Sequence, residues 1–270
     1  MKFKTKNRHS VLRYGISKLA LVTLLMGMST YSFASIEDCY LSRDLPNEDI
    51  IKNCMPYAKQ DPIATGILGA VYSEEKNYKK TLDYNLWVTN FYKKNGVPTN
   101  AHEYNSYTGI LTAIGSIYYF GEAGKANKTK GLEYITKAAN LGNNIAQNQL
   151  GDFYASKDDF PGRNLATAYR WYQLAIAQDY EPTKSGIFIS NLDTITKQAP
   201  YCIAMGEQLV AQAYLNGSAG LPKDSSKAKE YLSQAIALYK DNEPTKESYK
   251  YCAKQKGLGL ESAEKQLKSL

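Results

Sequence analysis

Residues 111–121 read Leu-Thr-Ala-Ile-Gly-Ser-Ile-Tyr-Tyr-Phe-Gly, and residues 150–154 repeat part of this pattern as Leu-Gly-Asp-Phe-Tyr. Gly115 and Gly151 are 36 residues apart, and Tyr118 is followed by Tyr154 at the same distance. A fixed period of this length is typical of repeat proteins, in which each repeat is one supersecondary unit. The stretch therefore predicts a fold built from repeated units.

A second pattern follows each of these stretches, with small or apolar residues at i, i+3, i+4 and i+7, which form one face of a helix. It occurs at Gly131, Tyr134, Ile135 and Ala138; at Ala168, Trp171, Tyr172 and Ala175; and at Ala228, Tyr231, Leu232 and Ala235. Tyr214 supplies the first helix of the last unit, and a less regular earlier unit contains Leu68, Gly69, Tyr72, Trp87 and Phe91. We predict four helix–loop–helix units at 64–95, 106–141, 146–179 and 203–239. The expected fold class is all-α, a right-handed α-solenoid in which neighbouring units cover each other's apolar faces.

Two segments interrupt the regular spacing. The loop 95–107 contains Pro98, His102 and Tyr104, and we expect it to be an irregular spacer. Residues 180–202 are longer than a normal connection, and they are either a helix extension with a loop or an excursion that forms part of a binding surface. Phe188 lies in this insertion and is a candidate contact residue.

The first 34 residues have the three parts of a secretory signal peptide. They carry six of the 33 basic residues and no acidic residue, followed by a short apolar run from Leu19 to Met28 and small residues at Ser32 and Ala34. We expect cleavage after Ala34 and a periplasmic location. The net charge then falls from +7 to +1, which removes the argument for a nucleic-acid partner. The apolar run is too short to span a bilayer.

The four cysteines, Cys39, Cys54, Cys202 and Cys252, all follow the predicted leader. An even number of cysteines in an oxidising compartment indicates two disulfides, and three pairings are possible. We favour Cys39–Cys54 and Cys202–Cys252, because each pair brackets one terminal section. The expected organisation is an N-terminal cap at 35–63, the repeats at 64–240 and a C-terminal capping helix region at 241–270. A zinc site is disfavoured, because CxxC spacing is absent and one histidine remains after cleavage.

The Leu-Gly-x-x-Tyr helix, the Gly-containing loop with Lys-Asp and the Ala-x-x-Trp/Tyr-Tyr/Leu-x-x-Ala helix resemble the Sel-1-like repeat family, a relative of the tetratricopeptide repeats. The resemblance implies a protein-binding scaffold whose concave face is lined by the first helix of each unit. Small exported proteins of this type resemble immunity proteins that neutralise type VI secretion effectors of the lipase type. On this basis we expect a secreted effector as the protein partner, with the insertion helping to cover its active site.

The first helices carry polar pairs at equivalent positions relative to Gly115, Gly151 and Ala211. These pairs are Thr112 with Ser116, Asn148 with Asp152, and Gln208 with Gln212. Each pair is spaced i, i+4 and therefore shares a helix face. The pairs predict a column of partner-binding groups, although a merely solvated face would show the same pattern. Tyr119 is either an anchor for the partner or a core residue.

The sequence contains no convincing catalytic set. Ser-x-x-Lys occurs at Ser73, Ser226 and Ser262, but the other penicillin-recognising motifs come in the wrong order and Tyr214 is explained as repeat core. His102 lacks a defined partner for acid–base work. We therefore expect neither enzyme activity nor a cofactor. An envelope or secretion scaffold, and a β-lactam-binding or cell-wall enzyme, are the alternative functions.

Overall fold

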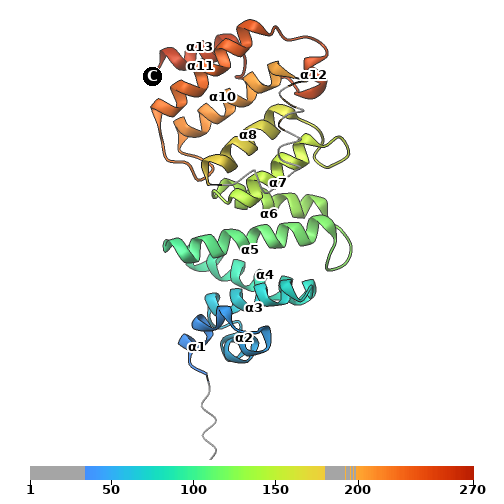
Figure 1. Ribbon diagram of the computed structural model, residues 1–270, viewed down its shortest axis with the longest axis vertical. Helices are drawn as coiled ribbons and strands as arrows, with labels where there is room; N and C mark the ends of the chain where they lie inside the picture. The colour runs from blue at the N-terminus through green and yellow to red at the C-terminus, as the bar shows by residue number, and fades with distance from the viewer. Residues whose placement is uncertain (1–33, 180–191, 193–194, 196, 198) are drawn as a thin grey trace, which may run out of the picture. The chain divides into compact units, whose positions relative to one another are not determined.

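The computed structural model describes residues 34–179, 192, 195, 197 and 199–270, and residues Ala34–Leu270 form one compact unit. The helix pairs of this unit follow one another along the chain (Figure 1). They are α3 (Pro62–Glu74) with α4 (Tyr78–Asn95), α5 (Ala101–Phe120) with α6 (Lys128–Asn140), α7 (Asn144–Ala155) with α8 (Leu165–Ala177), and α10 (Pro200–Asn216) with α11 (Ser225–Asp241). Each pair packs on the next, so the described chain is an α-solenoid.

Shorter helices precede and follow these pairs. The N-terminal segment contains α1 (Ile36–Leu41), the 3₁₀ turn η1 (Ser42–Asp44), α2 (Asn47–Cys54) and the 3₁₀ turn η2 (Met55–Tyr57). The C-terminal segment contains α12 (Ser248–Tyr251) and α13 (Leu260–Lys268), and α13 packs on α11. Within the described ranges, every regular element is helical.

The same joint connects the two helices of each pair. The tyrosine near the end of the first helix accepts a hydrogen bond, through its carbonyl oxygen, from the N–H of the residue that caps the second helix. The four bonds join Asn77 to Tyr72 (2.8 Å), Asn127 to Tyr118 (2.7 Å), Asn164 to Tyr154 (2.8 Å) and Asp224 to Tyr214 (3.1 Å). The side chain of each cap then accepts from a backbone N–H in the first turn of its helix.

The tyrosine rings also pack across the joint. Tyr118 stacks on Tyr134 with ring centroids 6.1 Å apart, and Tyr214 stacks on Tyr231 at 5.8 Å. The earlier pair stacks Tyr72 on Tyr84 at 5.5 Å. The recurring tyrosines thus hold the two helices of one unit together, and these stacked pairs use six of the 23 tyrosines.

Both disulfides form with the favoured pairing. Cys39–Cys54 joins α1 to α2, and Cys202–Cys252 joins α10 to the residue after α12. All four cysteines are fully buried. Each bond fastens one terminal segment to its neighbour.

The expected irregular spacer at 95–107 is wrong over most of its length, because α5 begins at Ala101. The Asn100 side chain caps this helix by accepting from the N–H groups of His102 at 2.9 Å and Glu103 at 3.2 Å. At the other expected interruption, Pro200–Cys202 belong to α10. Most of the remaining insertion, including Phe188, lies outside the described residues.

Candidate partner-binding surface

Thr112 and Ser116, the predicted pair on α5, are tied to α7. Thr112 is buried, and its hydroxyl hydrogen-bonds the Thr108 carbonyl at 2.9 Å and Asn143 Oδ1 at 3.1 Å. Ser116 is half-buried, and its hydroxyl exchanges hydrogen bonds with the side-chain amide of Gln149 at 3.1–3.2 Å. Of the two, Ser116 is the one that reaches the surface.

Asn148 and Asp152, the pair on α7, bond to each other and to α8. Asn148 is 9% exposed and donates to Asp152 Oδ2 at 3.3 Å. The other carboxylate oxygen of Asp152 accepts from the Tyr172 hydroxyl at 2.8 Å. The carboxylate therefore holds the two helices of one unit together, and only part of it faces solvent.

The pair on α10, Gln208 and Gln212, consists of one buried and one half-exposed side chain. Gln208 is fully buried; its Oε1 accepts from the Tyr239 hydroxyl and the Gly259 N–H, each at 3.0 Å. Its Nε2 donates to the Gly257 carbonyl and to Ser262, each at 3.3 Å. The expectation that Gln208 contacts a partner is wrong for this reason: its side chain holds the C-terminal segment. Gln212, one turn later, is half-exposed.

Tyr119 is a core residue. It is 1% exposed, stacks on Phe153 with centroids 4.0 Å apart and donates its hydroxyl to the Phe160 carbonyl at 2.7 Å. Burial, helped by the charge of Asp159, raises the pKa of Tyr119 to about 12. Of its two predicted roles, the packing role fits this environment and the anchor role does not.

The expected polar column is therefore discontinuous. The bonds from Thr112 and Ser116 connect α5 to α7, whereas Gln208 points into the C-terminal segment. Ser116, Asp152 and Gln212 remain partly accessible and form the candidate surface. Gln149, which pairs with Ser116, was missed by the sequence analysis, although it follows Asn148 directly.

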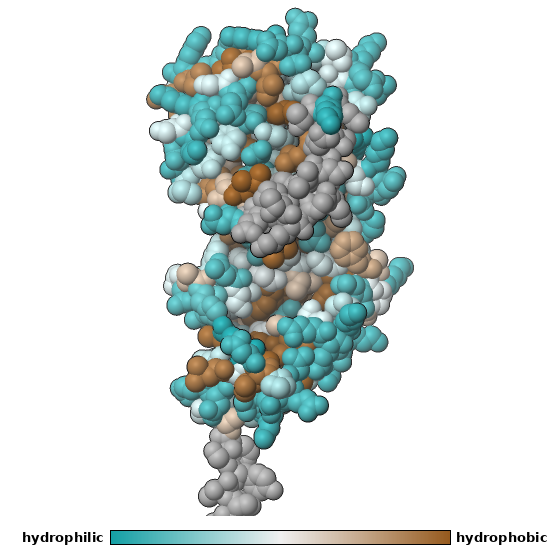
Figure 2. Space-filling model, in the orientation of Figure 1, coloured by the Kyte–Doolittle hydropathy of each residue, from teal (hydrophilic) through white to brown (hydrophobic). Residues whose placement is uncertain are grey.

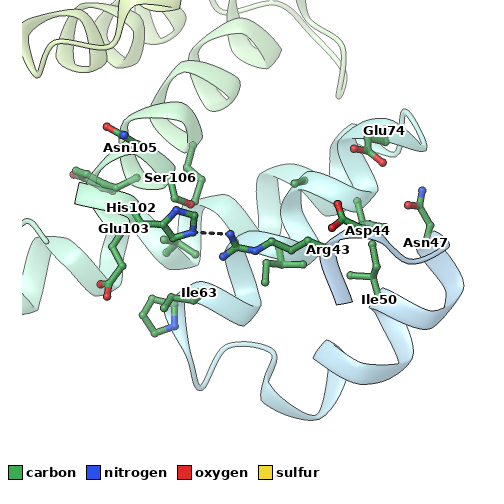
Figure 3. A pocket seen from close by; sticks show the side chains of 18 of the residues that line it. Arg43, Asp44, Asn47, Ile50, Ile63, Glu74, His102, Glu103, Asn105 and Ser106 are labelled. Atoms are coloured by element: carbon green, nitrogen blue, oxygen red, sulfur yellow. Dashed lines mark hydrogen bonds between the residues drawn. The ribbon is translucent and has the colours of Figure 1, made fainter. Parts of the chain in front are cut away.

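A pocket near the N-terminus was also missed. A cavity of about 470 Å³ lies between the N-terminal segment and the helices α3 and α5 (Figure 3). Its apolar lining includes Ile50, Ile63 and Ile110. Arg43 Nη1 lies 2.6 Å from His102 Nε2 across the pocket. A guanidinium has no acceptor, so Arg43 donates and the imidazole nitrogen accepts.

Tyr214, which the penicillin-recognising motifs would need, has a structural role. Tyr214 is 8% exposed and belongs to the core of its repeat. Another of the penicillin-recognising motifs, Lys184-Ser185-Gly186, lies outside the described residues. In the described part of the chain, no group of three His, Cys, Asp or Glu side chains is arranged to hold a metal ion. Over the same residues, no helix has both the length and the apolarity needed to cross a membrane.

Comparison with known proteins finds one family whose model matches parts of the chain. Three segments match the Sel1 repeat family, at residues 111–143, 144–180 and 201–239. The less regular first unit, 64–95, is not among them. Among curated proteins, none matches the chain.

The solved structures include a Sel1 repeat protein from Oxalobacter formigenes, to which this chain is similar with 19% sequence identity and a TM-score of 0.41. The match covers 71% of this chain but only 46% of the Oxalobacter protein, so this chain spans less than half of that relative. The second half of α5 with α6, then α7 with α8, and then α10 with α11 lie within the three matched segments, apart from the first residue of α10 and the last residues of α11. Three segments of the chain, 111–143, 144–180 and 201–239, are therefore similar to the Sel1 repeat.

Proposed function

We propose that the protein is an exported scaffold that binds a protein partner through the first helices of its repeats. The observation that carries this proposal is the set of Sel1 repeats, since such repeats indicate protein interaction. Stacked repeats present extended surfaces to partners, because each repeat contributes equivalent positions to one face. Ser116, Asp152 and Gln212 are the accessible polar positions of the first helices at which contact is proposed.

Export is supported by two features of the chain. The first is the basic and then apolar pattern of residues 1–34. The second is the pair of disulfides, which persist in oxidising compartments such as the periplasm. We propose cleavage after Ala34, which mass spectrometry of the exported protein tests through a start at Ser35.

The narrower proposal is that the protein neutralises a secreted effector of the lipase type by covering its active site. It rests on the resemblance to exported Sel-1-like immunity proteins. In this mechanism the chain contributes binding surface and no chemical step. Inhibition would then be stoichiometric and would need no turnover by this protein.

Site-specific crosslinking in the cells that produce the protein tests the proposal. A photo-crosslinking amino acid at Gln212 or Ser116 is expected to give one dominant protein adduct. The same amino acid at the exposed positions Glu133 on α6 and Lys229 on α11 is the matched control, which is expected to give none. Equal adducts at all four positions would contradict binding through the first helices.

The identity of the crosslinked protein separates the narrower proposal from its alternative. A secreted lipase whose activity is lost at a one-to-one ratio supports immunity. A component of the cell wall or of a secretion apparatus, with no inhibited enzyme, supports the scaffold alternative and overturns immunity.

A further inference from the structure

The N-terminal pocket has a second, connected part. A smaller cavity of about 310 Å³ continues between α3 and α5 and shares Gly66, Ala70 and Ile110 with the first. The combined groove is lined by small residues spaced i, i+3, i+4 and i+7 on α3, and by a matching row on α5. The two rows are Gly66, Gly69, Ala70 and Ser73, and Ser106, Gly109, Ile110 and Ala113. Ile110 is the one large side chain in these rows, and its Cδ1 lies 3.2 Å from where a β-carbon of Gly66 would be. The other positions carry small side chains or none, which leaves room for an extended chain segment beside this contact.

The apolar surface extends beyond the groove. Leu45 lines the pocket and is 47% exposed, and Leu41, at the end of α1, is 81% exposed. In the space-filling view, brown apolar surface gathers among teal residues at the N-terminal end of the described chain (Figure 2). Exposed apolar surface next to a pocket is typical of interaction sites.

The charges around the pocket are mainly negative. Three carboxylates, Asp44, Glu74 and Glu103, line it with one guanidinium, Arg43, which is engaged by His102. Glu103 accepts a hydrogen bond from the Tyr92 hydroxyl at 3.3 Å. Asp44 and Glu74 lie at the opposite end of the pocket from His102 (Figure 3), both are exposed, and neither forms an ion pair within the described chain. A cationic occupant would complement this end.

A buried acceptor also lies at the groove. Asn85 lines the channel from α4, is 3% exposed, and its Oδ1 has no hydrogen-bond partner among the described residues. Buried acceptors are almost always satisfied, so an unpaired one calls for a donor. The oxygen lies against Gly69, where a β-carbon would come within 2.1 Å of it.

We infer that this groove binds an extended segment of a partner protein in which aliphatic side chains are followed by lysine or arginine. The aliphatic side chains occupy the pocket over Ile50 and Ile67, and the basic group lies between Asp44 and Glu74. This inference rests on the proposed protein-binding function and adds a second contact surface, distinct from Ser116, Asp152 and Gln212.

A peptide titration tests the inference with the full exported protein. The probe is a fluorescent peptide, acetyl-Gly-Ser-Leu-Ile-Leu-Lys-Lys-Ser-Gly-amide, and its counterpart carries Glu-Glu in place of Lys-Lys. We expect saturable binding of the basic probe, read by fluorescence anisotropy, and at least roughly tenfold weaker binding of the acidic one. Equal affinity for both probes, or binding of neither, would overturn the inference.

Two variants locate the site. Ala70→Trp places a ring in the groove from an exposed position and is expected to abolish binding of the probe. Ala237→Trp, at an exposed position on α11, is the matched control and is expected to bind normally. Asp44→Asn with Glu74→Gln is expected to weaken the basic probe about tenfold, since exposed ion pairs are individually weak. Retained binding in Ala70→Trp would contradict the site.

The crosslinking experiment at Gln212 shows whether a failure of the peptide test concerns only the groove or also the proposed scaffold function. If the Gln212 adduct forms while the basic probe does not bind, the scaffold proposal stands and the groove inference falls. If neither occurs, both fall.

Discussion

Gly115 on α5 and Gly131 on α6 lie in direct backbone contact where the two helices cross. A β-carbon at Gly131 would lie 2.7 Å from the Gly115 carbonyl oxygen and 2.6 Å from the backbone nitrogen of Tyr119. Both obstacles are main-chain atoms, which cannot rotate away as a side chain would. The distance between these helices is therefore set by the absence of a side chain at Gly131.

Gly131→Ala is accordingly expected to destabilise the fold. Overpacking of this kind costs about 1–3 kcal/mol in the free energy of unfolding. Gly109→Ala on α5 is the matched control, because a β-carbon there meets nothing within 4 Å. That substitution is expected to be neutral or to stabilise by about 0.5–1 kcal/mol, because alanine favours helix. Denaturant unfolding measures both, and equal effects would contradict the crossing described here.

Gln208 and Gln212 offer a second matched pair on one helix. Gln208→Leu leaves the Gly259 N–H and the Tyr239 hydroxyl without their acceptor, and unsatisfied buried groups cost about 1–3 kcal/mol each. Gln212→Leu removes a half-exposed side chain and is expected to change stability by less than about 0.5 kcal/mol. Thermal unfolding measures the stability of both variants. If Gln212→Leu lowered the stability as much as Gln208→Leu does, the roles assigned to the two side chains would be contradicted.

The two disulfides are expected to contribute unequally to the free energy of unfolding. The chain-entropy relation gives about 4 kcal/mol for Cys202–Cys252, which spans 50 residues, and about 3 kcal/mol for Cys39–Cys54, which spans 15. Double Cys→Ala variants of each pair, compared by urea unfolding, test this order. If removing Cys39–Cys54 lowered the free energy of unfolding more than removing Cys202–Cys252, loop length would not explain the difference between the two disulfides.

Glu207 on α10 makes stability depend on pH. Burial, with a smaller contribution from the charge of Glu230, raises the pKa of Glu207 to about 7, against the hydrogen bond from Tyr169, which lowers it. Between its ordinary pKa of 4.5 and about 7 the folded state keeps a proton that the unfolded state has lost. The free energy of unfolding therefore falls as pH rises through this window, and the loss is complete above it.

Glu207→Gln removes this dependence while keeping an oxygen that accepts from Tyr169. The variant is expected to be more stable than the natural protein at pH 8 by about 2–3 kcal/mol, and close to it at pH 4. Melting temperatures at the two pH values provide the measurement. A gain of the same size at pH 4 would show that proton release is not its cause.

The repeat pattern predicted most of the fold, because local spacing determines it. Tyr118 and Tyr134 were placed in one unit from their periodicity, and the structure stacks them. The start of α5 was misplaced although its signal was available: Asn100 followed three residues later by Glu103 is typical of a helix N-terminus.

The candidate surface was harder to predict, because its environment depends on distant residues. The burial of Gln208 depends on Gly257, Gly259 and Ser262, about 50 residues later, and no local pattern links them. Arg43 and His102 are 59 residues apart in the sequence and lie in contact across the N-terminal pocket. Neither residue, taken alone, predicts that a pocket forms there. Equivalent repeat positions therefore do not guarantee equivalent exposure.

The affinity of the purified protein for its crosslinked partner tests binding through the first helices most directly. Ser116→Arg combined with Gln212→Arg places two bulky cations on the first-helix surface, whereas Glu133→Arg combined with Lys229→Glu changes only the second helices. We predict at least roughly hundredfold weaker binding for the first variant, equivalent to about 2.7 kcal/mol, and normal binding for the second. The first variant is also expected to melt slightly lower, because it loses the hydrogen bonds between Ser116 and Gln149, but to remain folded at the temperature of the binding measurement. Unchanged affinity in the first variant, or a loss in the second alone, would contradict binding through the first helices of the repeats.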